Sequence, residues 1–260
     1  RLEGETKKGV YPKDVILAVL GKIRADGAVY KAIDFTGSYV DQLNVAGRMV
    51  ICNMAVEMGA KTAYMQPNQA VLDYVDARAA GPWEAETTDP GYRYEESYVF
   101  DVSSLEPQLA CPDSVENVHP LTEVTAEGPV KLDQGYIGSC TGGREEDIAA
   151  AASILRGRHI PEYTRLVVVP ASREVMLSCM EKGYIQDLME AGATITTPGC
   201  GACLGAHEGI LAPGEVCISS TNRNFPGRMG STEARIYLAS PAAVAASILN
   251  GRITDPRIYL

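Results

Sequence analysis

The chain contains 260 residues, of which 46% are hydrophobic and 22% are charged, as in an average globular protein. This composition excludes a disordered or collagen-like chain, and no apolar run approaches the roughly 18 residues that span a bilayer. Acidic residues number 33 against 23 basic ones, for a formal net charge of −10. Because an acidic surface repels phosphate backbones, we expect neither a nucleic acid nor a membrane as a partner.

The chain contains seven cysteines, an odd number, and it is long enough to form a hydrophobic core without stabilising disulfide bonds. The cysteines predict a reducing compartment, the cytoplasm. The first residue is Arg1, with no methionine before it and no secretory leader after it. We therefore expect an excised or processed piece of a protein whose upstream part is missing.

The first half of the chain alternates between helical and strand patterns. Pro12 suits the first turn of a helix that ends at Gly27. The following pattern predicts, in order, strand 29–35, helix 41–58, strand 62–66, helix 69–79 and an edge strand over 94–102. Residues 80–93 are acidic and rich in glycine and proline, which is typical of an exposed loop.

Residues 103–133 carry four prolines and no long periodic segment, so we place a domain boundary there, between residues 1–115 and 116–260. The second half predicts strands at 134–139, 165–169, 193–196 and 215–219, and helices at 144–157, 172–182, 184–191 and 241–249. This alternation predicts an α/β fold with parallel or mixed sheets. We expect two three-layer αβα units.

Three cysteines lie in glycine-rich segments that follow predicted strands. Cys140 stands in Gly-Ser-Cys-Thr-Gly-Gly, and Cys200 and Cys203 stand in Pro-Gly-Cys-Gly-Ala-Cys-Leu-Gly. Since ligands bind beyond the carboxyl ends of strands in open α/β sheets, the three thiols could meet there. Their spacing leaves open an iron–sulfur cluster, a zinc site completed by His207 or Cys140, and a redox pair. The other cysteines are expected to act as small apolar residues, namely Cys52, Cys111, Cys179 and Cys217.

Two further groups of polar residues are candidates for a site. Arg223 and Arg228 flank a Pro-Gly turn after strand 215–219, and two guanidinium groups there could bind a carboxylate, unless the loop is merely solvated. On helix 41–58, Asn44 and Arg48 share one face with Asp41, and Asn53 and Glu57 lie on roughly the opposite face. If the first face is solvated, Asn53 and Glu57 point inward, where a carboxylate is costly unless it is paired or functional.

Several motifs, taken together and in order, resemble those of the aconitase superfamily of iron–sulfur hydro-lyases. The resemblance is strongest to the large subunits of 3-isopropylmalate dehydratase, an enzyme of leucine biosynthesis, and of homoaconitase. The matching segments run through nearly the whole chain and are Tyr11-Pro12-Lys13-Asp14-Val15-Ile16-Leu17, Ile51-Cys52-Asn53-Met54, Gly138-Ser139-Cys140-Thr141, Gly199-Cys200-Gly201-Ala202-Cys203, Asn222-Arg223-Asn224-Phe225, Leu238-Ala239-Ser240-Pro241 and Thr254-Asp255-Pro256-Arg257.

The resemblance implies that Cys140, Cys200 and Cys203 hold a 4Fe–4S cluster whose fourth iron binds substrate as a Lewis acid. It also implies that the acidic active-site residue is Glu57, which contacts water or hydroxyl on that iron. It further implies that Asn53 and Asn222 are polar residues beside the cluster, and that Arg223 and Arg228 bind the substrate carboxylates. The implied reaction dehydrates a 2-hydroxy diacid such as isopropylmalate to an alkene and rehydrates it, without redox work by the cluster.

The same resemblance implies partners that this chain lacks: a first domain of the large subunit, and a small subunit or swivelling domain that supplies a serine base. We therefore expect the chain alone to be inactive. Departures at Thr141-Gly142-Gly143 and Pro67-Asn68 leave homoaconitase and 2,3-dimethylmalate dehydratase as alternatives. A zinc-binding structural module and an RNA-binding aconitase relative are alternatives of a different class, and the acidic charge argues against the second.

Overall fold

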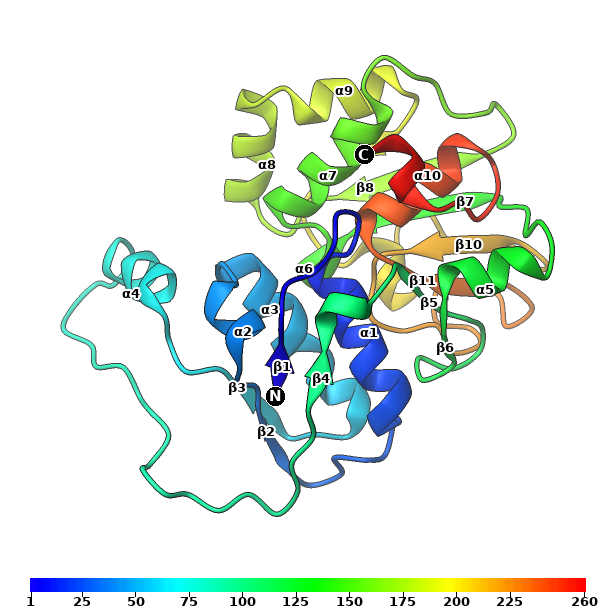
Figure 1. Ribbon diagram of the computed structural model, residues 1–260. Coiled ribbons are helices and arrows are strands. Elements are labelled where there is room, and N and C mark those ends of the chain that lie inside the picture. The colour runs from blue at the N-terminus through cyan, green and yellow to red at the C-terminus, as the bar shows by residue number, and fades with distance from the viewer.

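A seven-stranded sheet lies at the centre of the protein, whose computed structural model describes residues 1–260 (Figure 1). The strand order is β6-β5-β11-β10-β7-β8-β9, with parallel pairing from β11 to β9 and antiparallel pairing of β5 with β11 and of β6 with β5. The strands are β5 (Gln108–Ala110), β6 (Val118–Pro120), β7 (Gln134–Gly138), β8 (Arg165–Val169), β9 (Thr194–Ile195), β10 (Val216–Ser219) and β11 (Arg235–Leu238). The predicted α/β class with a mixed sheet is confirmed.

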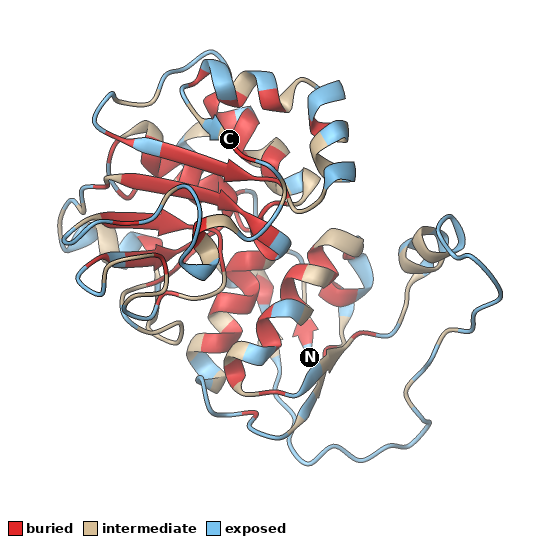
Figure 2. Ribbon diagram, turned by 180° about the vertical axis from the view of Figure 1, so that it is seen from behind, coloured by how far each residue is buried: buried red, intermediate tan, exposed pale blue.

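Helices cover both faces of this sheet. Helices α7 (Glu145–Leu155) and α10 (Pro241–Leu249) pack on one face, with α1 (Pro12–Ile23) and α3 (Val45–Met54) on the other. Because successive side chains of a strand point to opposite faces, Tyr136 belongs to the core beneath α1 and α3, and Ile137 belongs to the core beneath α7 and α10. Figure 2 shows the middle strands of the sheet, β7, β8, β10 and β11, as almost entirely buried.

Two small parallel sheets complete the part built from residues 1–101. One pairs β1 (Leu2–Glu3) with β4 (Phe100–Asp101), and the other pairs β2 (Ala32–Asp34) with β3 (Thr62–Tyr64). The remaining helices are α2 (Ser38–Gln42), η1 (Ala55–Met58), α4 (Gln69–Asp76), η2 (Val102–Ser104), α5 (Leu121–Ala126), α6 (Ser139–Gly142), α8 (Arg173–Glu181), α9 (Tyr184–Glu190), η3 (Gly201–Leu204) and η4 (Pro256–Tyr259). None of the helices is both long enough and apolar enough to cross a membrane.

The division into domains 1–115 and 116–260 stays a prediction. Its boundary falls between β5 and β6, which are neighbouring strands of the large sheet. Residues from both sides of the boundary also share one apolar core, which includes residues of α1 and α3 and residues of β7, β8, β10 and β11.

The expected helix 41–58 is wrong in its extent and in its exposed face. The helix breaks at Leu43, whose backbone is extended, and α3 begins again with Asn44 as its N-cap. Arg48 is only 5% exposed, since its guanidinium donates to the carbonyl oxygens of Val40, Leu43 and Gln66. The break resets the helical register, so Asp41 and Asn44 are exposed whereas Arg48 is buried, and Asn53, which was expected to point inward, is exposed.

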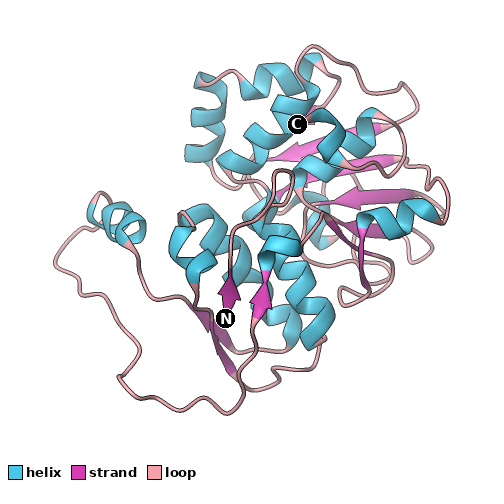
Figure 3. Cartoon of the chain, viewed as in Figure 1, coloured by secondary structure: helices cyan, strands magenta, loops and turns pink.

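The expected edge strand 94–102 is also wrong, because only Phe100–Asp101 pair with another strand. Residues 77–99 form a long loop that extends away from the body between α4 and β4, as Figure 3 shows. Glu95 and Glu96 pair with Lys31 across this loop instead of facing a sheet. The alternation of residues suited a strand, but no neighbouring strand is present to pair with it.

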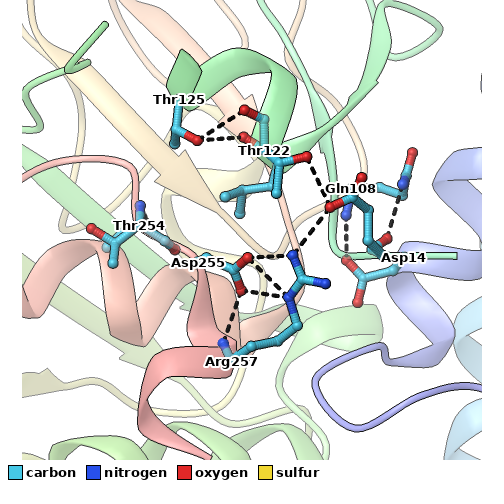
Figure 4. Close-up of polar contacts among 10 residues, drawn as sticks. Asp14, Gln108, Thr122, Thr125, Thr254, Asp255 and Arg257 are labelled. Carbon is cyan, nitrogen blue, oxygen red and sulfur yellow. Dashed lines mark hydrogen bonds and ion pairs between the residues drawn. The ribbon is translucent and has the colours of Figure 1, made fainter.

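The C-terminal segment is tied back to the start of β5 (Figure 4). Arg257 of η4 pairs with Asp255 and with Glu106, which in turn accepts a hydrogen bond from Thr122 of α5. Beside them, Asp14 of α1 accepts hydrogen bonds from the backbone N–H groups of Tyr11 and Gln108. These contacts fix α1 against the sheet.

Candidate active site

The carboxyl ends of the parallel strands bring the second-half candidate residues to one edge of the sheet. Cys140 follows β7, Cys200 follows β9, and Arg223 follows β10. Across from this edge, α3 and η1 carry the two candidates of the first half, Asn53 and Glu57. Such an edge is where open α/β sheets bind ligands.

Glu57 and Arg223 form an ion pair although 166 residues separate them in the chain. Arg223 Nε donates to both carboxylate oxygens, at 2.9 and 3.1 Å. The Glu57 side chain is 9% exposed and that of Arg223 is 39% exposed. Burial raises the pKa of Glu57, and the nearby charges of Arg223, Lys13 and Arg228 oppose that rise. A carboxyl group with a raised pKa and a cation beside it is suited to proton transfer.

The segment that carries Cys140 is held by contacts on both sides. Asn53 donates to Thr141 Oγ1 at 3.2 Å, so α3 contacts α6 directly. Ser220 Oγ accepts from the Gly138 N–H at 2.9 Å and donates to the Gly142 carbonyl at 3.0 Å. These contacts place the Cys140 turn against the main chain that leads to Asn222.

A hydroxyl group holds the segment with Cys200 and Cys203. Tyr136 of β7 donates to the Cys200 carbonyl at 2.7 Å. Gly201 has a φ of +53°, and a Cβ there would lie 2.7 Å from Tyr136 Oη. Only glycine therefore fits between the tyrosine and the turn. Cys200 is exposed and Cys203 is half-buried.

The donor set fits an iron–sulfur cluster in chemistry and location. All three cysteines are free thiols at one edge of the sheet, and thiolates are the ligands of such clusters. They are not, however, already gathered: no three side chains of the types His, Cys, Asp or Glu lie close enough together to hold a metal ion. His207, the alternative zinc ligand, is exposed in the turn after η3.

Two of the predicted substrate-binding residues have unsatisfied polar atoms. Asn222 Oδ1 and Arg228 Nε are buried without a hydrogen-bond partner. The guanidinium of Arg228 lies 5.6 Å from the centre of the Phe225 ring. Buried polar atoms are nearly always paired, so these two atoms mark a place where a ligand or another protein segment would complete the contacts.

From the sequence alone, neither Lys13 nor Asn224 was given a role. Asn224 was only part of a matching motif, but it is 1% exposed, and its amide donates to the Cys111 carbonyl at 2.7 Å. Lys13 is 3% exposed, and its ammonium donates to the Thr221 carbonyl at 2.5 Å. A lysine and an aspartate directly before the apolar run Val15-Ile16-Leu17 were the available signal.

Comparison with known proteins shows the family of the chain. Residues 1–251 match the family described as "Aconitase family (aconitate hydratase)". Similar curated proteins are "3-isopropylmalate dehydratase large subunit 1" of Methanopyrus kandleri (51% identity over 100% of this chain and 61% of the relative) and "Probable methanogen homoaconitase large subunit" of Methanothermobacter thermautotrophicus (50% identity over 98% and 59%). A third, "3-isopropylmalate dehydratase large subunit" of Hydrogenobaculum sp., is 47% identical over 97% and 59%. The chain spans about 60% of the length of these relatives, and it belongs to the aconitase family.

Proposed function

We propose that the chain is the cluster-bearing part of the large subunit of an iron–sulfur hydro-lyase that acts on a 2-hydroxy diacid such as isopropylmalate. The ion pair between Glu57 and Arg223 carries this proposal. It places a buried acid and a carboxylate-binding guanidinium side by side, at the sheet edge where three cysteine thiols also lie. The two most similar relatives above bear the names of two such enzymes.

Cys140, Cys200 and Cys203 would hold a 4Fe–4S cluster, which supplies Lewis-acid chemistry at an iron without a protein ligand. Arg223 and Arg228 bind and orient the substrate carboxylates through their guanidinium groups. Asn53 and Asn222 donate or accept hydrogen bonds beside them. Glu57 holds a proton for the hydroxyl group that leaves as water and takes it back on rehydration, a role that its raised pKa favours.

We place a small subunit, and a further part of the large subunit, over this face. The relatives are named large subunits, and the proposed small subunit supplies the serine base that removes the carbon-bound proton. Asn53, Cys140 and Cys200 are exposed at the site, which leaves the edge of the sheet open to a covering surface. We infer that the assembly works in the cytoplasm, where its free thiols stay reduced.

The direct test is an assay of the large subunit that contains this chain, prepared without oxygen and assembled with its small subunit. We expect bound iron and sulfide, and interconversion of a 2-hydroxy diacid with its alkene. Isopropylmalate, homocitrate and 2,3-dimethylmalate should be compared at equal concentration, because the three candidate enzymes differ in these substrates. Stoichiometric zinc without iron, and no turnover of any diacid, would refute the proposal in favour of a structural module.

A further inference from the structure

Lys13 is a buried cation whose role nothing above accounts for. It lies in the first turn of α1 and is 3% exposed. Its ammonium donates to two uncharged atoms, the Thr221 carbonyl at 2.5 Å and Met54 Sδ at 3.1 Å. The neighbouring Asp14 directs its carboxylate to the N–H groups of Tyr11 and Gln108 instead.

This placement is costly in two ways. A charged group loses its hydration on burial, and the cost is recovered only by close pairing or by a function. The N-terminal end of a helix is in addition the positive end of its dipole, so a cation there is repelled. Burial accordingly lowers the pKa of Lys13 to about 8.

Acidic groups of four elements surround Lys13 and favour its charged form. They are Asp14 of α1, Glu57 of η1, Asp147 of α7 and Cys203 of η3. Two of these, Glu57 and Cys203, belong to the candidate active site. Lys13 is therefore a buried positive charge beside the candidate active site.

The Thr221 carbonyl links Lys13 to Arg223. The other polar groups of Thr221 are satisfied locally, since its N–H donates to Ser219 Oγ and its hydroxyl contacts the same oxygen at 2.8 Å. Its carbonyl is held by Lys13. On the other side of Arg223, Asn224 is held by the Cys111 carbonyl. Arg223 thus lies between two buried anchors.

We propose that Lys13 is a positioning residue, whose ammonium holds the Thr221 carbonyl and so sets the turn that presents Arg223 to Glu57. Its effect on catalysis rests on the proposed function, but its effect on the ion pair does not. Without the ammonium, the Thr221 carbonyl would be buried without its donor, and the turn would shift to reach another. The Arg223 guanidinium would then lose its alignment with both Glu57 oxygens.

The experiment compares Lys13→Met, which removes the ammonium, with Lys13→Gln, which keeps an N–H donor without the charge. Lys22→Met is the matched control, because Lys22 is an exposed lysine of the same helix. Circular dichroism establishes that each variant folds. Hydrogen exchange of the Arg223 Nε–H, followed by NMR of protein labelled with ¹⁵N-arginine, reports the ion pair directly.

In Lys13→Met we expect Arg223 Nε–H exchange to rise about tenfold or more, the scale of one lost charge-assisted hydrogen bond. The exchange rate of the Arg223 Nε–H in Lys13→Gln should lie between the rates of Lys13→Met and the wild type. The rate in Lys22→Met should equal that of the wild type. If Lys13→Met does not fold, Lys13→Gln decides by the same signal. A folded variant without the ammonium whose Arg223 Nε–H stays protected to within about twofold of wild type would overturn the proposal.

Kinetics of the assembled enzyme give a second readout. If Arg223 binds a substrate carboxylate, Lys13→Met should raise KM more than it lowers kcat, whereas a purely structural lysine would change only the amount of folded protein. An inactive wild-type assembly would refute the proposed function, and the exchange measurement would still decide the role of Lys13. An unchanged KM in an active, folded variant would count against the proposal.

Discussion

Arg223 meets Glu57 through its Nε atom alone, so the terminal nitrogens of the guanidinium are not part of this contact and can face a substrate carboxylate. In the assembled enzyme, Arg223→Lys should lower kcat/KM by about 2–4 kcal/mol of transition-state stabilisation, since an ammonium cannot serve both partners. Steady-state kinetics with the preferred diacid measures this. The control is Arg173→Lys, an exposed arginine of α8, and near-wild-type efficiency of both variants would make the loop a solvated turn.

Glu57→Gln should separate binding from turnover. The amide keeps the size of the side chain and a hydrogen-bond acceptor, so diacid binding should largely survive. It carries no exchangeable carboxyl proton, so kcat should fall by about 100-fold or more. Equilibrium binding of the diacid, measured beside kcat, distinguishes the two effects. Equal loss of binding and turnover would instead assign Glu57 to holding Arg223 in place.

Asp14 should make the stability of the fold depend on pH. It is fully buried, and burial raises its pKa from 3.8 to about 7. The folded chain therefore binds this proton more tightly than the unfolded chain does, and stability falls as pH rises from about 4 to about 7. The Asp14→Asn variant has no carboxyl group at this position, so its stability should not fall over this pH range for this reason.

Relative to the wild type, the free energy of unfolding of Asp14→Asn should improve by about 2–3 kcal/mol between pH 5 and pH 8. The variant also loses one of the two hydrogen bonds that the carboxylate accepts, but that cost is the same at both pH values. Urea titrations at the two pH values measure the difference, with the exposed Asp26→Asn as control. A constant gap between Asp14→Asn and wild type would show that the buried carboxyl titrates normally.

At the residue scale, the sequence indicated candidate site residues but not their partners. The inward direction of Glu57 was argued from a helical face, and the side chain is indeed 9% exposed. That inward direction was inferred from a solvent face that included Arg48, but Arg48 is only 5% exposed. Three backbone carbonyls bury that guanidinium, and a periodic pattern carries no information about such acceptors.

At the scale of the elements, α6 packs closely against the main chain that follows β10. A Cβ at Gly142 would collide with both the side chain and the carbonyl oxygen of Ser220, and a backbone atom cannot move aside cheaply. Gly142→Ala should therefore destabilise the fold by about 1–3 kcal/mol, as measured by chemical denaturation. Gly199→Ala is the matched control, since its Cβ would meet open space. If the two variants were equally stable, the turn at Cys140 would be more adaptable than this packing implies.

Most helices and parallel strands were predictable as elements, because their apolar residues recur with the helical or strand period over several turns or pairs. The strands β5 and β6 were missed because they lie in the segment 103–133, whose four prolines were interpreted as a domain boundary. Strand β11 (Arg235–Leu238) was missed although it ends in the apolar run Ile236-Tyr237-Leu238. Antiparallel pairing at one edge of the sheet followed from none of these patterns.

For the molecule as a whole, the loop 77–99 should open before the core unfolds. It contains no helix or strand, and the preceding α4 has no buried residue. The only tryptophan of the chain, Trp83, lies in this loop and donates to Asp76 Oδ1 at 2.9 Å. Tryptophan fluorescence should therefore change at a lower urea concentration than far-UV circular dichroism does. Coincident transitions would mean that the loop is as stable as the sheet.

The assembly of the site was the part least accessible to sequence reasoning. The strand-end rule predicted that the residues following β7, β9 and β10 lie at one edge of the sheet, because parallel strands share that edge. That Glu57 would lie across from them depends on α1 and α3 covering one face of the sheet. Such packing between distant segments is decided by the shapes of two apolar surfaces, which composition and period do not encode.

The loop 77–99 has a further consequence, since it separates the two contributors to the ion pair. Glu57 precedes it, Arg223 follows it, and its residues are mostly exposed. Exposed loops tolerate cleavage when the pieces on either side pack well. A protein of this design could thus be encoded as two separate polypeptides that associate through the apolar face of the sheet. Each polypeptide would contain only one residue of the acid–guanidinium pair, so the pair would form only when the two polypeptides associate.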